Sequence, residues 1–389
     1  MELKTGYKNT VIGVIPEDWE IEIIRNFSNP VRGGSPRPAG SPLYFNGNYI
    51  PWLTVASLTN IPNSQLFVYK TDTFLTKAGS YFSRTLEKNT LIIANSGATL
   101  GVAKILGIKC CANDGIAALL NIDKKINERY LVYFINTLTQ SLRERIATGN
   151  GQPNLNTDLI GNIQIPLPPL PEQTAIATVL SDTDSLIQAL EKKIAKKQLI
   201  KKGAMQKLLT PKDDWEVKTL GDFLIYEQPT KYIVKNTKYN DNFDIPVLTA
   251  GKTFILGYSN EKKGIFNNYP VIIFDDFTTA SKYVKFPFKV KSSAMKILKP
   301  KNENVNLRFI FEIMQQINFP LGDHKRHWIG EFQPLEIKVP KSKEEKNRIS
   351  QILSDMDNEI ETLQNKLSKY KQLKQGLMQN LLTGKIRLV

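Results

Sequence analysis

The chain has 389 residues, of which 41% are hydrophobic, 9% are aromatic and two are cysteines. This composition excludes a disordered tail protein and a secreted disulfide scaffold, and no run reaches the roughly 18 apolar residues of a membrane span. Lysine and arginine (52) outnumber acidic residues (37), and the net charge of +15 indicates either a polyanionic partner or a Lys-rich surface.

Residues 19–165 mix short β-like runs with one helix-like run. Leu91–Ala94 and Gly101–Ile105 predict strands, and Glu128–Arg145 predicts a helix. The loops are rich in Gly, Pro, Ser and Asn, notably Arg32–Pro38 and Gly149–Asn154. We therefore expect an α+β domain of ordinary size.

A long helix is predicted next, over Glu172–Thr210. Its apolar residues follow 3-4 spacing, interrupted by Thr183, Lys197 and Lys201, which is typical of a helix that pairs with another. Prolines from Pro166 to Pro171 fix its start, and Pro211 ends it.

Residues 215–340 show the same plan as the first block. Pro270–Phe274 and Tyr283–Val290 predict strands, and Leu307–Ile317 predicts a helix. A second long helix follows over Glu345–Thr383, where Lys374 alone is off the apolar pattern.

The two long helices are an internal repeat. Shifting the chain by 173 residues places Glu172–Thr210 on Glu345–Thr383 without a gap, and 17 of the 39 positions are identical. Two fainter echoes link the blocks. Asp18-Trp19-Glu20 returns as Asp214-Trp215-Glu216, and Ile50–Thr54 is matched by Ile245–Thr249.

Equivalent blocks joined by equivalent helices close into a ring with approximate two-fold symmetry if the helices lie antiparallel. We therefore expect pairing within the chain, with the N-terminal and C-terminal segments near each other. The alternative is a coiled coil that only dimerises the protein.

These features resemble the specificity subunit of type I restriction-modification systems. The resemblance covers nearly the whole chain. It is carried by Gly33-Gly34-Ser35-Pro36, Ile50-Pro51-Trp52, Ile163–Pro171 with Glu172-Gln173, Met205–Thr210, Pro246–Lys252, Ile273–Phe277 and Lys291–Lys296.

The resemblance implies two target-recognition domains, at 1–165 and 212–340, and two antiparallel helical arms, at 166–211 and 341–389. Each domain would read one half of a split, asymmetric DNA sequence. The arms would space the half-sites and dock two methyltransferase subunits, and restriction/translocase subunits could join them. S-adenosylmethionine, ATP and Mg would then act on the partners, and this chain would hold no cofactor.

Other chemistry is weakly supported by the residues. Ala250–Thr253 imitates the end of a phosphate-binding loop, but Pro246 replaces its first glycine. Asp275-Asp276 lacks the acid-x-Lys spacing of a nuclease, and His324 and His327 lack a third metal ligand. Pro168-Pro169 is the one Pro-Pro pair and has no aromatic neighbour for amino-methyl transfer. A cryptic nuclease or ATPase, or an interaction protein without sequence preference, stays an alternative.

We therefore predict no catalytic residue and no metal site. The adjacent Cys110 and Cys111 are expected to be buried filler, and the lack of a signal-peptide pattern at Met1–Tyr7 suggests a cytoplasmic protein. The candidate DNA-contacting residues are polar or charged and lie in predicted loops. They are Arg32, Arg37, Arg84, Ser96 and Gln152 in the first block, and Lys252, Asp275, Thr278, Lys282, Lys325 and Arg326 in the second.

Overall fold

The computed structural model describes residues 5–97, 99–146, 154–249, 253–319 and 327–388. The chain divides into two compact units, Met1–Lys193 with Leu363–Val389 and Ile194–Thr362. Each unit therefore contains one mixed block together with a segment of each long helix. Among the described residues, no helix is long and apolar enough to cross a membrane.

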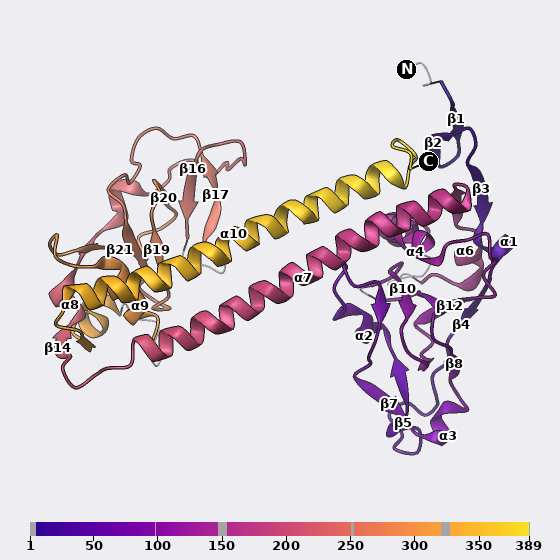
Figure 1. The fold of residues 1–389 in the computed structure, drawn as a ribbon, viewed down its shortest axis with the longest axis horizontal. Helices are drawn as coiled ribbons and strands as arrows, with labels where there is room; N and C mark the ends of the chain where they lie inside the picture. The colour runs from indigo at the N-terminus through magenta and orange to yellow at the C-terminus, as the bar shows by residue number, and fades with distance from the viewer. Residues whose placement is uncertain (1–4, 98, 147–153, 250–252, 320–326, 389) are drawn as a thin grey trace. The chain divides into compact units, whose positions relative to one another are not determined.

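The long helices are α7 (Leu170–Leu208) and α10 (Lys343–Leu381), each a continuous helix of 39 residues (Figure 1). Both begin and end two residues earlier than predicted, so their bounds keep the offset of 173. Pro171 is tolerated because the first helical turn has no intrahelical partner for its backbone nitrogen.

Ion pairs join the two helices within each unit. As residue numbers rise along α7 they fall along α10, so the helices are antiparallel and pair within the chain, as predicted. The pairs are Asp184–Lys374 (2.7 Å) and Glu191–Lys371 (2.8 Å) in the first unit, and Lys197–Glu359 (2.7 Å) and Lys201–Asp357 (2.6 Å) in the second.

The first unit contains a five-stranded and a four-stranded sheet, with strand orders β4-β12-β9-β10-β6 and β7-β5-β11-β8. Their strands are β4 (Asn29–Arg32), β5 (Phe45–Leu53), β6 (Phe67–Val68), β7 (Thr73–Leu75), β8 (Arg84–Leu86), β9 (Leu91–Ala94), β10 (Ala103–Leu106), β11 (Cys110–Ala112) and β12 (Ile116–Leu120). The helices of this block are α1 (Ile24–Phe27), α2 (Val55–Thr59), α3 (Lys77–Ser80), α4 (Glu128–Thr137), α5 (Thr139–Ser141) and α6 (Thr157–Gly161), with a π-helix at Leu142–Ile146.

The second unit repeats this topology with fewer strands. Its sheets have the orders β15-β21-β18-β19 and β17-β16-β20. The strands are β15 (Leu224–Glu227), β16 (Ile245–Leu248), β17 (Ile255–Ser259), β18 (Val271–Asp275), β19 (Ser281–Val284), β20 (Lys289–Val290) and β21 (Met295–Pro300). Its helices are α8 (Leu220–Phe223) and α9 (Leu307–Met314), with a 3₁₀-helix at Pro229–Tyr232 and a π-helix at Trp328–Phe332.

The echoes between the blocks have a structural basis. β5 pairs in parallel with β11, and β16 pairs in parallel with β20, so Ile50–Thr54 and Ile245–Thr249 mark equivalent strands. Each block also has a two-stranded ribbon. β3 (Glu20–Ile23) pairs with β13 (Gln164–Leu167), and β14 (Glu216–Thr219) pairs with β22 (Glu336–Val339). Trp19 and Trp215 precede these ribbons, and both are buried.

Two predicted elements are each broken in the structure. The helix predicted over Glu128–Arg145 is interrupted at Leu138, since α4 ends at Thr137 and helical structure resumes as α5 and the π-helix Leu142–Ile146. At this point the hydroxyls of Thr137 and Thr139 donate to the carbonyls of Phe134 and Asn136 and compete with the helix. The run Tyr283–Val290 forms two short strands, β19 and β20, since Pro287 has no backbone N–H for a sheet.

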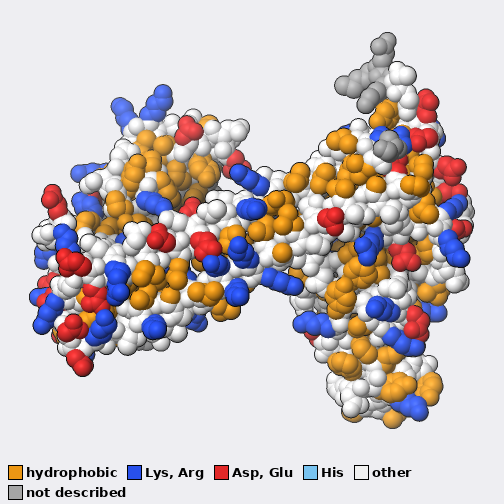
Figure 2. Space-filling view, viewed as in Figure 1, with side chains coloured by type: hydrophobic (Ala, Val, Ile, Leu, Met, Phe, Trp, Pro, Cys, Tyr) orange, Lys and Arg blue, Asp and Glu red, His pale blue; other side chains and the backbone are white. Residues whose placement is uncertain are grey.

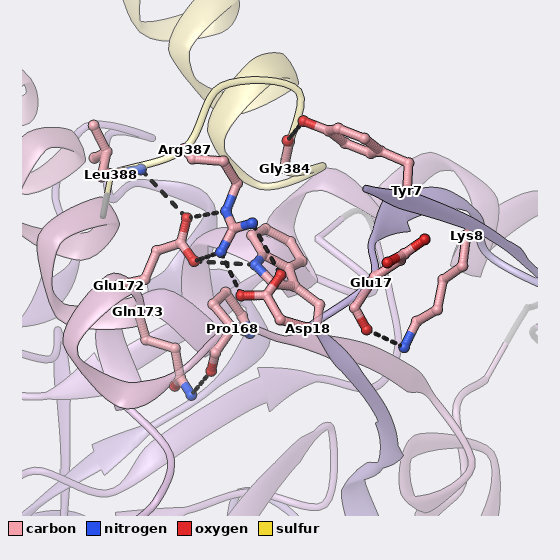
Figure 3. Close-up of polar contacts among 11 residues, drawn as sticks. Tyr7, Lys8, Glu17, Asp18, Pro168, Glu172, Gln173, Gly384, Arg387 and Leu388 are labelled. Carbon is pink, nitrogen blue, oxygen red and sulfur yellow. Dashed lines mark hydrogen bonds and ion pairs between the residues drawn. The ribbon is translucent and has the colours of Figure 1, made fainter. Parts of the chain in front are cut away.

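The N-terminal and C-terminal segments meet in the first unit, as predicted (Figure 3). Arg387 points between two carboxylates and donates to both oxygens of Asp18 (2.9 and 2.7 Å) and of Glu172 (2.7 and 2.8 Å). Glu172 is buried and also accepts from the indole of Trp19 at 3.0 Å. Tyr7, in the hairpin of β1 (Tyr7–Thr10) and β2 (Gly13–Pro16), donates to the carbonyl of Gly384 at 2.8 Å. We call the contacts of Arg387 with Asp18 and Glu172 the closing contact.

Cys110 and Cys111 are free and fully buried, as predicted. Burial raises the pKa of the Cys110 thiol to about 12, so it stays a protonated, apolar side chain at neutral pH.

Candidate nucleic-acid interface

In the first unit, four loops meet at one edge of the sheets. Because β5 and β11 are parallel, their following loops emerge together, and the amide of Asn113 donates to the carbonyl of Leu53 at 2.9 Å. The loop after β9 joins them, since the amide of Asn95 donates to the carbonyl of Gly115 at 2.9 Å. The loop after β4 is held by the bond from Gly33 N to Ile116 O at 2.8 Å. We call residues 32–35, 53–57, 95–97 and 113–115 the first loop edge.

The second unit builds the same edge. The loops after β16, β18 and β20 are connected by two equivalent bonds, from Lys291 N to Leu248 O at 2.8 Å and from Asp276 N to Ala294 O at 3.0 Å. We call residues 248–249, 275–278 and 291–294 the second loop edge. By strand register, Asp276 takes the place that Asn95 has in the first unit.

Glycine is required where the loop after β4 crosses the loop after β11. A Cβ on Gly33 would lie 2.1 Å from the backbone oxygen of Asn113, closer than any side-chain atom can approach. Gly34 is less crowded, and its amide donates to the carbonyl of Ala112 at 2.9 Å. The Gly33-Gly34 sequence therefore fixes the position of Arg32, which lies directly before it.

Two predicted arginines meet at the first loop edge. Arg84 Nε donates to the carbonyl of Arg32 at 2.6 Å, and Arg32 Nε donates to the carbonyl of Asp114 at 2.7 Å. The Asp114 carboxylate accepts from the hydroxyl of Ser35 at 2.6 Å and lies 3.9 Å from the Arg32 guanidinium. Because each Nε is already bonded to backbone, both guanidinium groups are oriented in advance. Both side chains are exposed, so they can donate to a base edge or a phosphate.

Ser96 lies at the first loop edge, whereas Arg37 is not held there by any hydrogen bond that the described residues make. Ser96 forms a β-bridge with Asn154, and its neighbour Asn95 donates to the carbonyl of Asp114 at 3.2 Å. Arg37 is exposed and has no hydrogen bond or ion pair within the described part of the chain. The structure therefore brings together Arg32, Arg84 and Ser96.

Asp275 and Thr278 interact with each other on the second loop edge. The Asp275 carboxylate accepts from the Thr278 hydroxyl at 2.5 Å and from the Phe277 amide at 3.0 Å, and the residue is 5% exposed. In this structure Asp275 therefore shapes the turn, and a contact of Asp275 or Thr278 with a base stays a prediction.

Asp276 is a buried structural acid. Its carboxylate lies 3.4 Å from the ammonium of Lys296, both side chains are 1% exposed, and it accepts from the amide of Trp328 at 2.9 Å. His327 donates its backbone amide to the carbonyl of Asp276, and its ring Nδ1 contacts Glu331 at 2.7 Å. Within the ranges that the structure describes, no cluster of three His, Cys, Asp or Glu side chains could hold a metal ion.

Lys282 is exposed on β19 and lines a cavity of about 630 Å³ with Lys285, Arg308 and Asp357. Four of the predicted DNA-contacting residues lie outside the described residues, namely Gln152, Lys252, Lys325 and Arg326. On the face shown in Figure 2, basic side chains are interspersed with acidic ones in both units.

Sequence reasoning missed Asn95, Asn113 and Asp114, which hold the first loop edge together. The tripeptide Asn113-Asp114-Gly115 is a turn signal between two β-like runs, so this loop could have been found. Nothing local in the sequence connects it with Arg32, because that contact depends on the pairing of β4 with β12.

The class of protein is defined by two domains of mixed sheets, each with one loop edge, and by a long helix that occurs twice. The model of the type I restriction modification DNA specificity domain matches residues 16–201 and again residues 212–372. The chain therefore belongs to the type I restriction-modification specificity family, whose members act in DNA sequence recognition.

Known relatives agree with this assignment. The chain is 27% identical to the type I restriction enzyme MjaVIII specificity subunit of Methanocaldococcus jannaschii, over 96% of this chain and 94% of that protein. It is 52% identical to the EcoR124I/EcoR124II specificity subunit of Escherichia coli over 126 residues, about a third of each chain. The fold is similar to that of the type I restriction-modification S subunit from M. genitalium, with a TM-score of 0.69, 15% identity and 98% of both chains covered.

Proposed function

We propose that this chain reads a bipartite, asymmetric DNA target, with each loop edge contacting one half-site. The observation that carries this proposal is a common loop framework, built twice, with different side chains on it. The first edge presents Arg32, Arg84 and Ser96, whereas the second presents Thr278 and the segment after Val290. Two different readers on one framework suit a target whose halves differ.

The side-chain chemistry supports direct readout. An arginine held through Nε has its two Nη groups left to donate, which matches the O6 and N7 acceptors of guanine in the major groove. Arg37, Gln152, Lys252, Lys325 and Arg326 extend the proposal to neighbouring loops, and Lys282 is proposed as a phosphate contact.

We further propose that α7 and α10 act as the spacer between half-sites and as the docking surface for two methyltransferase subunits, which restriction/translocase subunits join. The domain boundaries of this proposal are 1–165, 166–211, 212–340 and 341–389. S-adenosylmethionine, ATP and Mg act on the partners in this scheme, and this chain contributes no catalytic residue. The protein works in the cytoplasm, where the host DNA is.

The deciding experiment is to express the chain with its methyltransferase partner in a host that lacks other adenine methylation, and to map modified adenines by long-read sequencing. The proposal predicts one split motif with a fixed gap. It is wrong if the modified sites share no motif, or share one uninterrupted motif. The chain alone, incubated with S-adenosylmethionine and DNA, should transfer no methyl group.

Two assays address the alternatives. DNA cleavage or ATP hydrolysis by the purified chain with Mg²⁺, and without partners, would identify a cryptic enzyme. Equal affinity for target and random duplexes at moderate salt would indicate an interaction protein without sequence preference.

A further inference from the structure

Two ion pairs lie at repeat-equivalent positions of the long helices, the first buried and the second half-buried, with Lys201 17% and Asp357 36% exposed. In the first unit, Lys374 of α10 contacts Asp184 of α7 at 2.7 Å, with side chains 14% and 4% exposed. In the second unit, Lys201 of α7 contacts both carboxylate oxygens of Asp357 of α10 at 2.6 and 2.7 Å. The repeat offset of 173 maps Asp184 onto Asp357 and Lys201 onto Lys374.

These pairs explain two exceptions to the apolar pattern. Lys201 and Lys374 are interruptions of the apolar helical seam, as Thr183 and Lys197 also are, and each of the two has its carboxylate partner on the opposite helix. Between the two pairs α7 advances by 17 residues, from 184 to 201, and α10 recedes by the same 17, from 374 to 357. Both units therefore have the same antiparallel register.

Each pair is also a contact with the mixed block of its unit. In the first unit, the Tyr133 hydroxyl of α4 donates to Asp184 at 2.8 Å. In the second, Arg308 of α9 bonds both Asp357 and the fully buried Glu312. Tyr133 and Glu312 each follow the asparagine N-cap of their helix, Asn127 or Asn306, by six residues, so the two blocks dock on the arms in the same way.

An apolar seam alone does not fix the register, because leucines seven residues apart are interchangeable. The ion pairs do distinguish registers. A shift of α10 by seven residues in either direction would place Asp184 opposite Leu367 or Leu381, and Asp357 opposite Ile194 or Leu208. Asp184 is buried, and a buried carboxylate without a cation is strongly disfavoured, so the shifted registers are excluded by the first pair. Asp357 is more exposed and would lose its cation Lys201 at a smaller cost.

We propose that the Asp184–Lys374 and Lys201–Asp357 pairs determine the helix register and thereby the number of base pairs accepted between the two half-sites. These are positioning residues that influence DNA specificity without touching DNA. The inference rests on the proposed reading of a split target.

The test replaces the first pair by apolar residues, Asp184→Leu with Lys374→Met. Exchange of a buried ion pair for apolar residues often leaves stability unchanged or raises it, whereas it removes the polar constraint on register. The matched control is Glu191→Leu with Lys371→Met, which removes a more exposed pair between the same two helices. Lys374→Arg serves as the conservative variant, since it keeps the charge.

The variants are expressed with the methyltransferase partner, and modified adenines are mapped on plasmids that carry the two half-sites at every gap length. Wild type, the control and Lys374→Arg should modify one gap length. The apolar variant should modify neighbouring gap lengths about tenfold more often, with an unchanged or higher melting temperature.

If the apolar variant still modifies DNA at only one gap length between the half-sites, the inference is wrong, whatever the stability of that variant. Loss of the folded state in that variant also overturns it, because the pair would then serve stability. A relaxed gap in the control would show that any ion pair between the helices has this effect, which contradicts the special role of the repeat-equivalent pairs. If wild type itself shows no gap preference, it is the proposed split-site function that fails.

Discussion

The two loop edges share a backbone plan and differ in how they use charge. At the first edge, Arg32 and Arg84 are exposed and are bonded to backbone carbonyls, and the equivalent of Asp276 is the neutral Asn95. At the second edge, the charges at this place are turned inward as the buried Asp276–Lys296 pair. Main-chain hydrogen bonds therefore hold the loops of both edges in the same arrangement. The charged side chains differ in role, since those of the first edge are exposed and can contact DNA, whereas the Asp276–Lys296 pair stabilises the loop.

The largest expected effect comes from breaking the buried pair of the second edge. Asp276→Ala leaves Lys296 buried without a counter-ion and should lower the free energy of unfolding by about 3–5 kcal/mol. Asn95→Ala, at the equivalent place, removes one neutral hydrogen bond and should cost about 1 kcal/mol. Denaturant unfolding of both variants measures the difference, and equal losses would contradict it.

The closing contact offers the next comparison. Arg387→Ala leaves the buried Glu172 without its cation and should cost about 3 kcal/mol, at the low end for a buried pair because Arg387 stays 24% exposed. Its counterpart in the second unit is the pair of Glu345 with Lys212, which is 58% exposed, so Lys212→Ala should cost about 1 kcal/mol. Thermal unfolding of the two variants side by side tests this, and a larger loss for Lys212→Ala would refute it.

A smaller effect is expected on DNA recognition. Arg84→Ala should weaken binding by about 1–3 kcal/mol and relax base preference in one half-site, if Arg84 donates to a guanine. Lys88→Ala is the matched control, because Lys88 is an exposed cation of the same block that is not among the proposed DNA contacts. Competition binding on duplexes with single-base changes in each half-site gives the answer. Loss of preference in both halves would argue against separate readers.

The smallest effect is a pH dependence of the closing contact. The hydrogen bond from Arg387 lowers the pKa of Asp18 below its ordinary value of 3.8. Because the unfolded Asp18 takes up a proton first, its stabilising contribution is present above pH 3.8 and is lost as the pH falls through the lower folded pKa.

The difference in unfolding free energy between wild type and Asp18→Asn should therefore be constant near neutral pH and shrink below pH 3.8. Denaturant titrations of wild type and Asp18→Asn across this pH range measure the difference, and a difference that does not shrink below pH 3.8 would count against the assignment.

The sequence alone predicted the architecture because the architecture is repeated. The arms were placed to within two residues, since a 39-residue apolar period and flanking prolines are local signals. The echo of Ile50–Thr54 in Ile245–Thr249 marked equivalent strands for the same reason. Helix breaks such as Leu138 were missed, because threonine hydroxyls compete with backbone bonds only in a particular geometry.

The loop edges were only partly predictable. Arg32, Arg84 and Ser96 were chosen separately as polar loop residues, and their proximity depends on strand pairing between distant segments. Asp276 was weighed as a nuclease carboxylate and rejected on spacing. Its burial beside Lys296 was not foreseen, because the two residues come together only when β18 pairs with β21. Charge in a sequence does not tell whether a side chain will face solvent or another charge.

The closing contact has a consequence for the order of assembly. The first unit needs residues 363–388, which leave the ribosome about 170 residues after Lys193. During that interval Glu172 and Trp19 lack their contact with Arg387, and the second unit, residues 194–362, is synthesised in full. We therefore expect nascent chains to complete their second unit before their first, so that the environment of Trp19 is among the last to reach its native contacts.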